Sequence, residues 1–170
     1  SFCSVAGPDE PASFARQTLV RYGVKHTVIT DESRPTTLKQ RYRAEGKTLL
    51  RVSHMRQHDV RPAIAAEICK AVESRLHATD LLIFSDFNYG CLPQSVVNEI
   101  ISLGRKHKVT MVADSQASSQ VSDVSRFVGM RLITPTEREA RLALRDWNSG
   151  LVVVAEALQK KAQAEHVVLT

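Results

Sequence analysis

Two spacings of hydrophobic residues divide the chain into helices and strands. Ile64, Ile68, Val72 and Leu76 recur at four-residue steps and predict an amphipathic helix over 60–77. Continuous apolar runs that end in aspartate predict buried strands at 80–86 and 109–114. By the same criteria we expect helices at 11–23, 93–108, 122–129, 136–144 and 149–165, and strands before Gly7-Pro8 and at 25–30, 130–135 and 166–170.

From residue 80 onward the predicted strands alternate with helices. This order is typical of a parallel sheet with right-handed crossovers, so the fold class is α/β, a mostly parallel sheet flanked by helices. The length of 170 residues suits one domain, and 43% hydrophobic with 24% charged residues is ordinary for a soluble globular protein.

Residues 34–53 follow a different pattern, in which polar and apolar side chains alternate on two arms. Glu45-Gly46 lies between the arms and predicts the turn of a small β-hairpin flap. On the first arm one face is expected to carry Thr37, Lys39, Arg41 and Arg43, and the other Leu38, Gln40 and Tyr42. The second arm carries Leu49, Arg51 and Ser53 on one side and Leu50 and Val52 on the other.

The net charge of +5 is concentrated in this part of the chain. Residues 34–58 hold seven Lys and Arg against the single acid Glu45, so the remaining residues together are close to neutral. The flap could close over a phosphorylated substrate, bind a nucleic-acid backbone, or be a solvated edge whose charges deter aggregation. Because Tyr42 is its only aromatic residue, base stacking is not expected, and we expect no nucleic-acid partner.

Composition indicates the compartment. Cys3, Cys69 and Cys91 form neither a disulfide framework nor a metal knuckle, which favours a reducing cytoplasm. No apolar run approaches the roughly 18 residues that span a bilayer, and no secretory leader is visible, so we expect no membrane partner. The six histidines lack metal-ligand spacing.

Polar groups follow three successive predicted strands. Asp86, Asp114 and Thr134-Pro135-Thr136 stand at the strand ends, and Glu139 comes one helical turn later. Ligands of open parallel sheets lie beyond the carboxyl ends of the strands, and carboxylates gathered there can hold a divalent cation that bridges nucleotide phosphates. Capping of a turn or helix remains the alternative for each acid taken alone.

Taken in order, these segments resemble the ribokinase-like (PfkB-type) carbohydrate kinases, and most closely the heptose-phosphate kinase domain of bacterial ADP-heptose synthases. "SVAGPDEPA" resembles the family's V-G-x-D turn, with Asp9 on the acidic position. "RPTTLKQRYRAEGKTLLRVS" is similar to the flap segment of that branch. "LLIFSDFNYGCL", "VTMVADSQ" and "LITPTEREA" resemble the L-S-D-Y-x-K-G, V-x-x-D-P-K and T-P-N-x-x-E motifs.

The resemblance implies a ribokinase-like core at 1–33 and 54–170, with the flap at 34–53 as a lid. It implies a kinase that uses ATP and Mg2+ to phosphorylate a sugar or sugar phosphate such as a heptose phosphate. Asp86 would lie near the sugar, and Lys39, Arg41 and Arg51 would reach an anionic substrate from the flap. Thr136, Asp114 and Glu139 would lie near the nucleotide phosphates, with Glu139 holding magnesium through water. Family members often dimerise through their flaps, so a homodimer is possible.

The chain departs from the family motifs at four positions. Ser53 replaces an aspartate, Tyr89 and Gln116 replace lysines, and Thr136 replaces an asparagine. These changes favour a second hypothesis, a non-catalytic module that binds a phosphorylated metabolite or a partner. The family's first sugar-binding strands would precede Ser1, and the G-A-G-D loop with the general-base aspartate would follow Thr170. We therefore expect a central fragment that does not transfer phosphate by itself.

Overall fold

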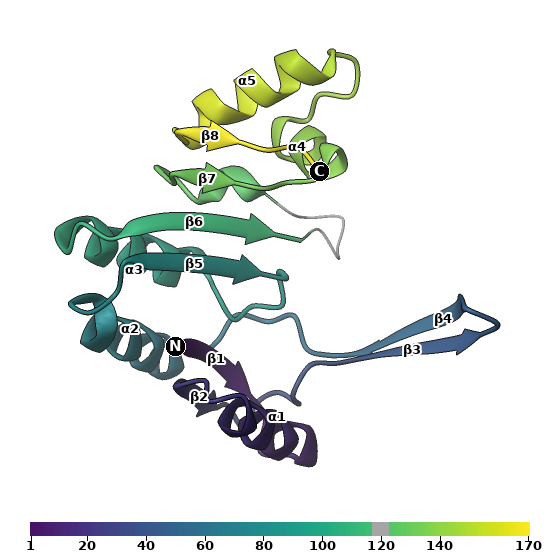
Figure 1. Cartoon of the computed structure of the whole chain (residues 1–170), viewed down its shortest axis with the longest axis vertical. Helices are drawn as coiled ribbons and strands as arrows, with labels where there is room; N and C mark the ends of the chain where they lie inside the picture. Colours follow the sequence, from purple (N-terminus) through teal and green to yellow (C-terminus); the bar gives the residue numbers. More distant parts are fainter. Residues whose placement is uncertain (117–122) are drawn as a thin grey trace. The chain divides into compact units, whose positions relative to one another are not determined.

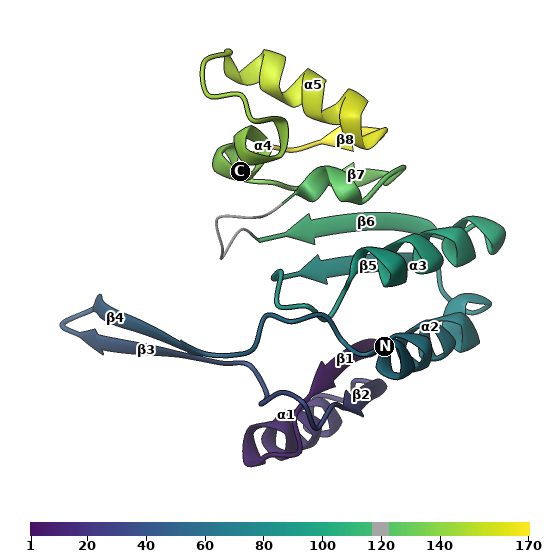
Figure 2. The ribbon, with the colours of Figure 1, turned by 180° about the vertical axis from the view of Figure 1, so that it is seen from behind.

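The computed structural model describes residues 1–116 and 123–170. The chain forms two compact units, one of residues 1–71 with 89–91 and one of residues 72–88 with 92–170. The ribbon is drawn from two sides in Figures 1 and 2.

The first unit is built on two short parallel strands and a helix. Strands β1 (Phe2–Ala6) and β2 (His26–Thr30) pair in parallel, and α1 (Glu10–Arg21) connects them. Asp9 is the N-cap of α1, since its carboxylate accepts a hydrogen bond from the amide of Ala12. The predicted helix at 11–23 and strand at 25–30 are thereby confirmed. The unit also contains the first turns of α2 (Pro62–Leu76), which continues into the second unit.

The flap is an antiparallel hairpin of β3 (Leu38–Ala44) and β4 (Lys47–His54), projecting away from β1 and β2 (Figures 1 and 2). Glu45 and Gly46 form its two-residue turn with φ of 48° and 78°, the positive values that a type I′ turn requires. The predicted turn and hairpin are confirmed. Arg41 pairs with Arg51 and Tyr42 with Leu50, and a register shift follows, so that Arg43 pairs with Thr48. The separation of the flap as a lid at 34–53 stays a prediction.

The second unit contains a four-stranded, all-parallel sheet in the order β5-β6-β7-β8. Its strands are β5 (Leu81–Asp86), β6 (Thr110–Ser115), β7 (Leu132–Ile133) and β8 (His166–Val167). Its helices are α3 (Gln94–Lys106), the 3-10 helix η1 (Val124–Arg126), α4 (Glu137–Leu144) and α5 (Leu151–Ala162). The α/β class and the parallel sheet predicted from residue 80 onward are confirmed.

Buried aliphatic and aromatic side chains hold this unit together. Phe84 of β5 packs against Phe127 with ring centroids 5.3 Å apart, and Val97 of α3 and Leu158 of α5 are fully buried. The helix predicted at 122–129 is only the three-residue η1, and Ser122 lies outside the described residues. A 3-10 helix has three residues per turn, so Val124 and Phe127, three positions apart, lie on the same side, and both are fully buried.

Within the described ranges, no helix is long and apolar enough to cross a membrane.

Candidate functional site

In the second unit, the carboxyl ends of neighbouring strands bring polar side chains to one edge of the sheet. Strands β5 and β6 lie side by side (Figure 1). Asp86 ends β5 and stands opposite Ser115, the last residue of β6. Beside them, the hydroxyl of Thr134 donates to the carboxylate of Asp114 over 3.2 Å. The edge predicted from the strand ends therefore exists, and it carries both aspartates.

Asp86 is buried and held on both carboxylate oxygens. Asp86 is 4% exposed. Oδ1 accepts the backbone amide of Asn88 at 2.9 Å, and Oδ2 accepts Nη2 of Arg126 at 2.7 Å and the hydroxyl of Ser115 at 3.4 Å. Three donors, one of them a guanidinium, therefore fix the direction of this buried carboxylate.

Arg126, the partner of Asp86, was not predicted from the sequence. The same Nη2 also donates to the carbonyl of Leu92 at 2.9 Å, and the guanidinium carbon lies 4.7 Å from the ring centre of Phe127. Its Nε is buried and has no partner among the described residues. In the sequence, Arg126 stands out only as an arginine within the segment "DVSRF", and this local pattern does not indicate that it pairs with Asp86.

Thr136 and Glu139 form the capping box of α4. The Thr136 hydroxyl accepts the Glu139 amide at 3.3 Å, and the Glu139 carboxylate accepts the Thr136 amide at 2.7 Å. Glu139 is buried, with 6% of its surface exposed, and its carboxylate caps the helix. Threonine is a good N-cap, as asparagine is, and the departure from the family motif at Thr136 therefore preserves the start of this helix.

The acids of this edge suit magnesium only through water. No group of three or more His, Cys, Asp or Glu that could enclose a metal occurs in the described part of the chain. The carboxylates of Asp114 and Glu139 offer hard oxygen ligands, and Mg2+ usually keeps several waters and needs few protein ligands. The residues present therefore fit a magnesium ion that is held through its water shell.

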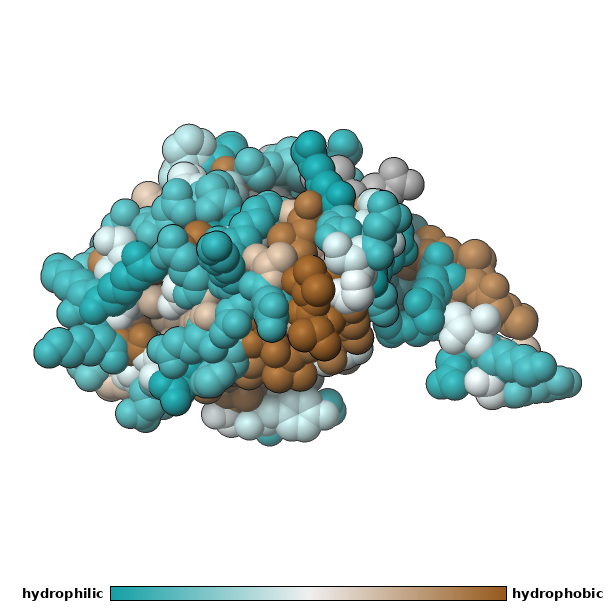
Figure 3. Space-filling view, turned by 90° about the horizontal axis from the view of Figure 1, so that it is seen from above, coloured by the Kyte–Doolittle hydropathy of each residue, from teal (hydrophilic) through white to brown (hydrophobic). Residues whose placement is uncertain are grey.

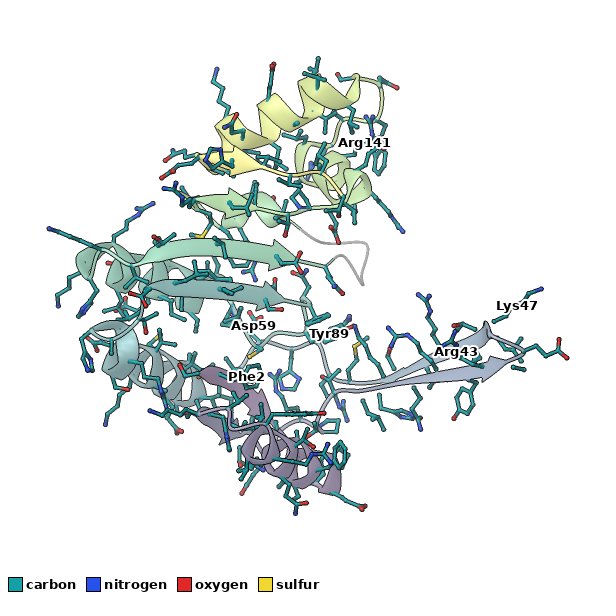
Figure 4. All side chains as sticks on the ribbon, viewed as in Figure 1. Phe2, Arg43, Lys47, Asp59, Tyr89 and Arg141 are labelled. Carbon is teal, nitrogen blue, oxygen red and sulfur yellow. The ribbon has the colours of Figure 1, made fainter. Side chains whose placement is uncertain are left out.

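The first unit carries the cationic side chains of the flap. Arg41 and Arg51 are directly opposite each other on β3 and β4, and both are exposed. The ammonium of Lys39 lies 5.1 Å from the ring centre of Tyr89. Figure 4 shows Arg43 and Lys47 further along the hairpin, and Figure 3 shows hydrophilic and hydrophobic side chains together on it.

The base of the flap is fixed by two buried or half-buried acids of the first unit. Asp9 accepts the hydroxyl and the amide of Thr36 at 2.6 and 2.8 Å. The side-chain hydrogen bond from Thr36 is the main reason why the pKa of Asp9 lies below its ordinary value of 3.8. Gly7 lies against the same segment, because a Cβ there would meet the carbonyl of Arg34 at 2.5 Å.

Asp31 and Arg34 form the second anchor. The Arg34 guanidinium donates to Asp31 at 3.0 Å, to the Tyr89 carbonyl at 3.0 Å and to the His58 carbonyl at 2.7 Å. Burial is the largest single effect on the pKa of Asp31 and raises it, but hydrogen bonds from Ser33 and Arg34 outweigh burial and lower the pKa. Arg34 thus joins the residues before β3, the residues after β4 and the loop at 89–91.

The predicted site residues are divided between the two units. Asp86, Asp114, Thr136 and Glu139 lie in the second, and Lys39, Arg41 and Arg51 lie in the first. Their joint action on one substrate stays a prediction.

Comparison with known proteins identifies relatives along the whole chain. The model of the pfkB family carbohydrate kinases matches residues 1–170. A bifunctional protein HldE from Geobacter sulfurreducens is 25% identical over 175 residues, which cover 100% of this chain and 35% of that protein. A D-beta-D-heptose 7-phosphate kinase from Bordetella bronchiseptica is 30% identical over 145 residues, which cover 85% of this chain and 44% of that protein.

Solved structures give the same fold. Ribokinase from Giardia lamblia superimposes with a TM-score of 0.74 at 15% identity, covering 99% of this chain and 52% of that one. The tetrameric inhibited form of phosphofructokinase-2 from Escherichia coli gives 0.73 at 14% identity, covering 98% and 55%. The ribokinase-like fold is therefore confirmed. The chain spans about a third of the first of these curated relatives and about half of the solved chains, and it belongs to the pfkB family of carbohydrate kinases.

Proposed function

We propose that these residues are part of a sugar kinase that transfers the γ-phosphate of ATP to a hydroxyl of a sugar or sugar phosphate, of which a heptose phosphate is the leading candidate. Membership of the pfkB family supports the reaction class, and the relative named as a heptose 7-phosphate kinase supports the substrate class. Both the use of ATP and three cysteines that form no disulfide among the described residues suit the cytoplasm.

The pairing of Arg41 with Arg51 is the observation that carries the choice of an anionic substrate. The two residues are directly opposite on the hairpin, where like charges destabilise the pair. A phosphate that accepts hydrogen bonds from both guanidinium groups removes this repulsion, because arginine forks match its oxygens. Lys39 on the same face adds a third cation, two residues along β3 from Arg41.

The second unit supplies the groups that the transfer itself needs. Asp86 would accept a hydrogen bond from a sugar hydroxyl and orient it, while Asp114, Thr136 and Glu139 would lie near the nucleotide phosphates. Asp114 and Glu139 would hold Mg2+ through water, and the ion would offset the charge of the phosphates during transfer. The resemblance assigns the general base to an aspartate in a G-A-G-D loop, a sequence that does not occur in these 170 residues. We therefore expect no turnover from this segment alone.

An ADP-release assay with the native full-length protein tests the proposal. We expect Mg-ATP turnover with a phosphorylated sugar, and a KM for that sugar at least tenfold higher in Arg41→Ala and Arg51→Ala. The matched control Lys106→Ala removes an exposed cation from α3 and should leave this KM unchanged. Absence of ADP release with every sugar and sugar phosphate of a broad panel would overturn the kinase function.

Tyr89 favours the second function, a degenerate module that binds without catalysis. The family places a lysine here, whereas this chain has an aromatic ring that is 9% exposed and lies beneath the Lys39 ammonium. Isothermal titration together with the ADP-release assay separates the two functions. A degenerate module binds sugar phosphate in the titration, through Arg41, but releases no ADP in the assay.

The flap could also mediate a homodimer. Leu49 and Leu50 are exposed on β4, and both edges of the two-stranded hairpin are open to pairing within the first unit. Deletion of residues 37–52 should then convert a dimer to a monomer in light scattering, and an unchanged mass would contradict the dimer.

A further inference from the structure

Arg126 has a contact pattern that the proposed function does not use. It is the last residue of η1 and sits between two elements of the second unit, the end of β5 through Asp86 and the start of the segment before α3 through the carbonyl of Leu92. Its side chain is 16% exposed, and its backbone is fixed because Val124 and Phe127 on either side are fully buried. The guanidinium therefore has one defined position, and that position is on Asp86.

The carboxylate of Asp86 has little remaining capacity. An ionised carboxylate offers about four acceptor sites. Asn88, Arg126 and Ser115 occupy three of them, at 2.9, 2.7 and 3.4 Å. At most about one site is left for a ligand, and its direction is set by the three donors that hold the group.

The charge of Asp86 is the second consideration. A bare carboxylate at the edge of the sheet would repel the phosphates of both substrates, since like charges in a partly buried site are weakly screened. The guanidinium at 2.7 Å neutralises it while leaving its oxygens as acceptors. The ion pair thus turns an anion into a neutral hydrogen-bond acceptor with a fixed direction.

We propose that Arg126 is a positioning residue of the kinase, which fixes and neutralises Asp86 so that its remaining acceptor site takes one hydroxyl of the sugar. The inference rests on the proposed function and deepens it, because it names how the sugar hydroxyl is selected. Arg126 itself does not touch the sugar.

Steady-state kinetics of the native full-length protein test this proposal with Arg126→Met, Arg126→Lys, Asp86→Asn and the double variant Asp86→Asn/Arg126→Met. We expect Arg126→Met to lower kcat/KM for the sugar about 10- to 100-fold, because misplacement of an orienting group by about 1 Å has that effect. The KM for ATP should stay within twofold. Arg126→Lys should recover part of the loss, since lysine restores the charge without the fork.

The double variant measures the coupling of the two residues. If Arg126 acts through Asp86, the double variant should lose no more kcat/KM for the sugar than Asp86→Asn alone. The double variant is also less prone to misfold than Arg126→Met, because removing both charges leaves no unpaired buried ion. A loss of activity in the double variant is therefore not explained by an unpaired charge. The control Arg131→Met breaks the exposed pair with Glu165 in the same unit and should leave all constants unchanged.

If the wild-type protein is active, three results would overturn the inference. The first is a kcat/KM for the sugar in Arg126→Met within twofold of wild type, and the second is a loss of kcat/KM in the double variant equal to the product of the losses in the two single variants. The third is a rise in the KM for ATP in Arg126→Met as large as the loss of kcat/KM for the sugar, which indicates a purely structural role. Absence of wild-type turnover with every sugar would instead overturn the proposed function, and the inference with it. The two failures are therefore distinguishable.

Discussion

The carboxylate of Asp9 binds Thr36 twice, through the hydroxyl at 2.6 Å and the amide at 2.8 Å, across 27 positions of sequence. The same carboxylate caps α1 through the amide of Ala12 at 3.1 Å. Thr36 is two residues before β3, so one side chain fixes both the start of a helix and the entry to the flap. The motif position that the family resemblance gives to Asp9 therefore has a structural function in this chain.

Replacement of Asp9 by alanine should destabilise the protein by about 2 kcal/mol. Loss of an N-cap costs about 1 kcal/mol, and the lost hydrogen bonds to Thr36 add about as much. The free energy of unfolding from urea titration measures this change. The control Glu10→Ala changes the neighbouring acid in the first turn of α1 and should cost less than about 0.5 kcal/mol. Equal losses in the two variants would contradict the double function of Asp9.

Asp9 should also contribute a pH-dependent part of the stability. Hydrogen bonds from Thr36 lower the pKa of Asp9 below 3.8, so the folded state binds this proton less readily than the unfolded state. Its contribution is complete above the unfolded pKa and is lost as pH falls through the lower, folded pKa. Urea titrations from pH 7 to pH 3 should show the gap between wild type and Asp9→Asn as constant down to about pH 5 and narrowing below it. A gap that widens as pH falls would contradict this sign.

Replacement of Arg34 by methionine should cost about 3–5 kcal/mol, the usual effect of removing the buried partner from a buried ion pair. Asp31 is 0% exposed and would lose its contact at 3.0 Å, and two backbone carbonyls would lose their donor as well. Chemical denaturation with a two-state fit gives the value.

Arg61 provides a control on the same carboxylate. It lies 3.5 Å from Asp31, but its side chain is 60% exposed. An exposed ion pair contributes at most about 1 kcal/mol, so Arg61→Met should be nearly neutral. Similar costs for Arg34→Met and Arg61→Met would show that burial does not decide the strength of these pairs.

Periodicity identified most of the fold because it reports local geometry. The i+4 stripe from Ile64 to Leu76 predicted α2, and the Glu45-Gly46 turn predicted the hairpin. The register shift between Tyr42 and Arg43 was not predicted. The assigned strands β7 (Leu132–Ile133) and β8 (His166–Val167) are shorter than the predicted ones. Backbone hydrogen bonds nevertheless continue beyond them, from the amide of Val168 to Ile133 and from the amide of Thr170 to Pro135.

The candidate site was less accessible to sequence reasoning. The strand-end rule placed Asp86 and Asp114 at one edge without any knowledge of their partners. The pairing of Asp86 with Arg126 joins residues 40 apart, and no local pattern encodes it. Similarly, Arg34 reaches Tyr89 across 55 positions, so its function as an anchor depends on tertiary structure alone.

Gly90→Ala should be far more destabilising than Gly46→Ala, although both glycines have the same backbone conformation. Their φ values are 75° and 78°, and alanine in this region costs about 1–2 kcal/mol at either position. A Cβ on Gly90 would also lie 2.0 Å from the carbonyl oxygen of His58, whereas a Cβ on Gly46 has nothing within 4 Å. Because the obstacle is backbone, the loop must move, and the hydrogen bond from the amide of Val60 to Gly90 is expected to break.

The two variants together separate strain from steric overlap. We expect Gly46→Ala to lose about 1 kcal/mol of unfolding free energy and Gly90→Ala at least about 2 kcal/mol more. In Figure 4 Tyr89 and Asp59 mark the two segments that would separate. Since Arg34 binds the carbonyls of both Tyr89 and His58, their separation should also expose the base of the flap to protease at residues 54–60. Equal stability of the two variants, or equal rates of cleavage at that site, would show that the close approach of Gly90 to His58 does not hold the flap.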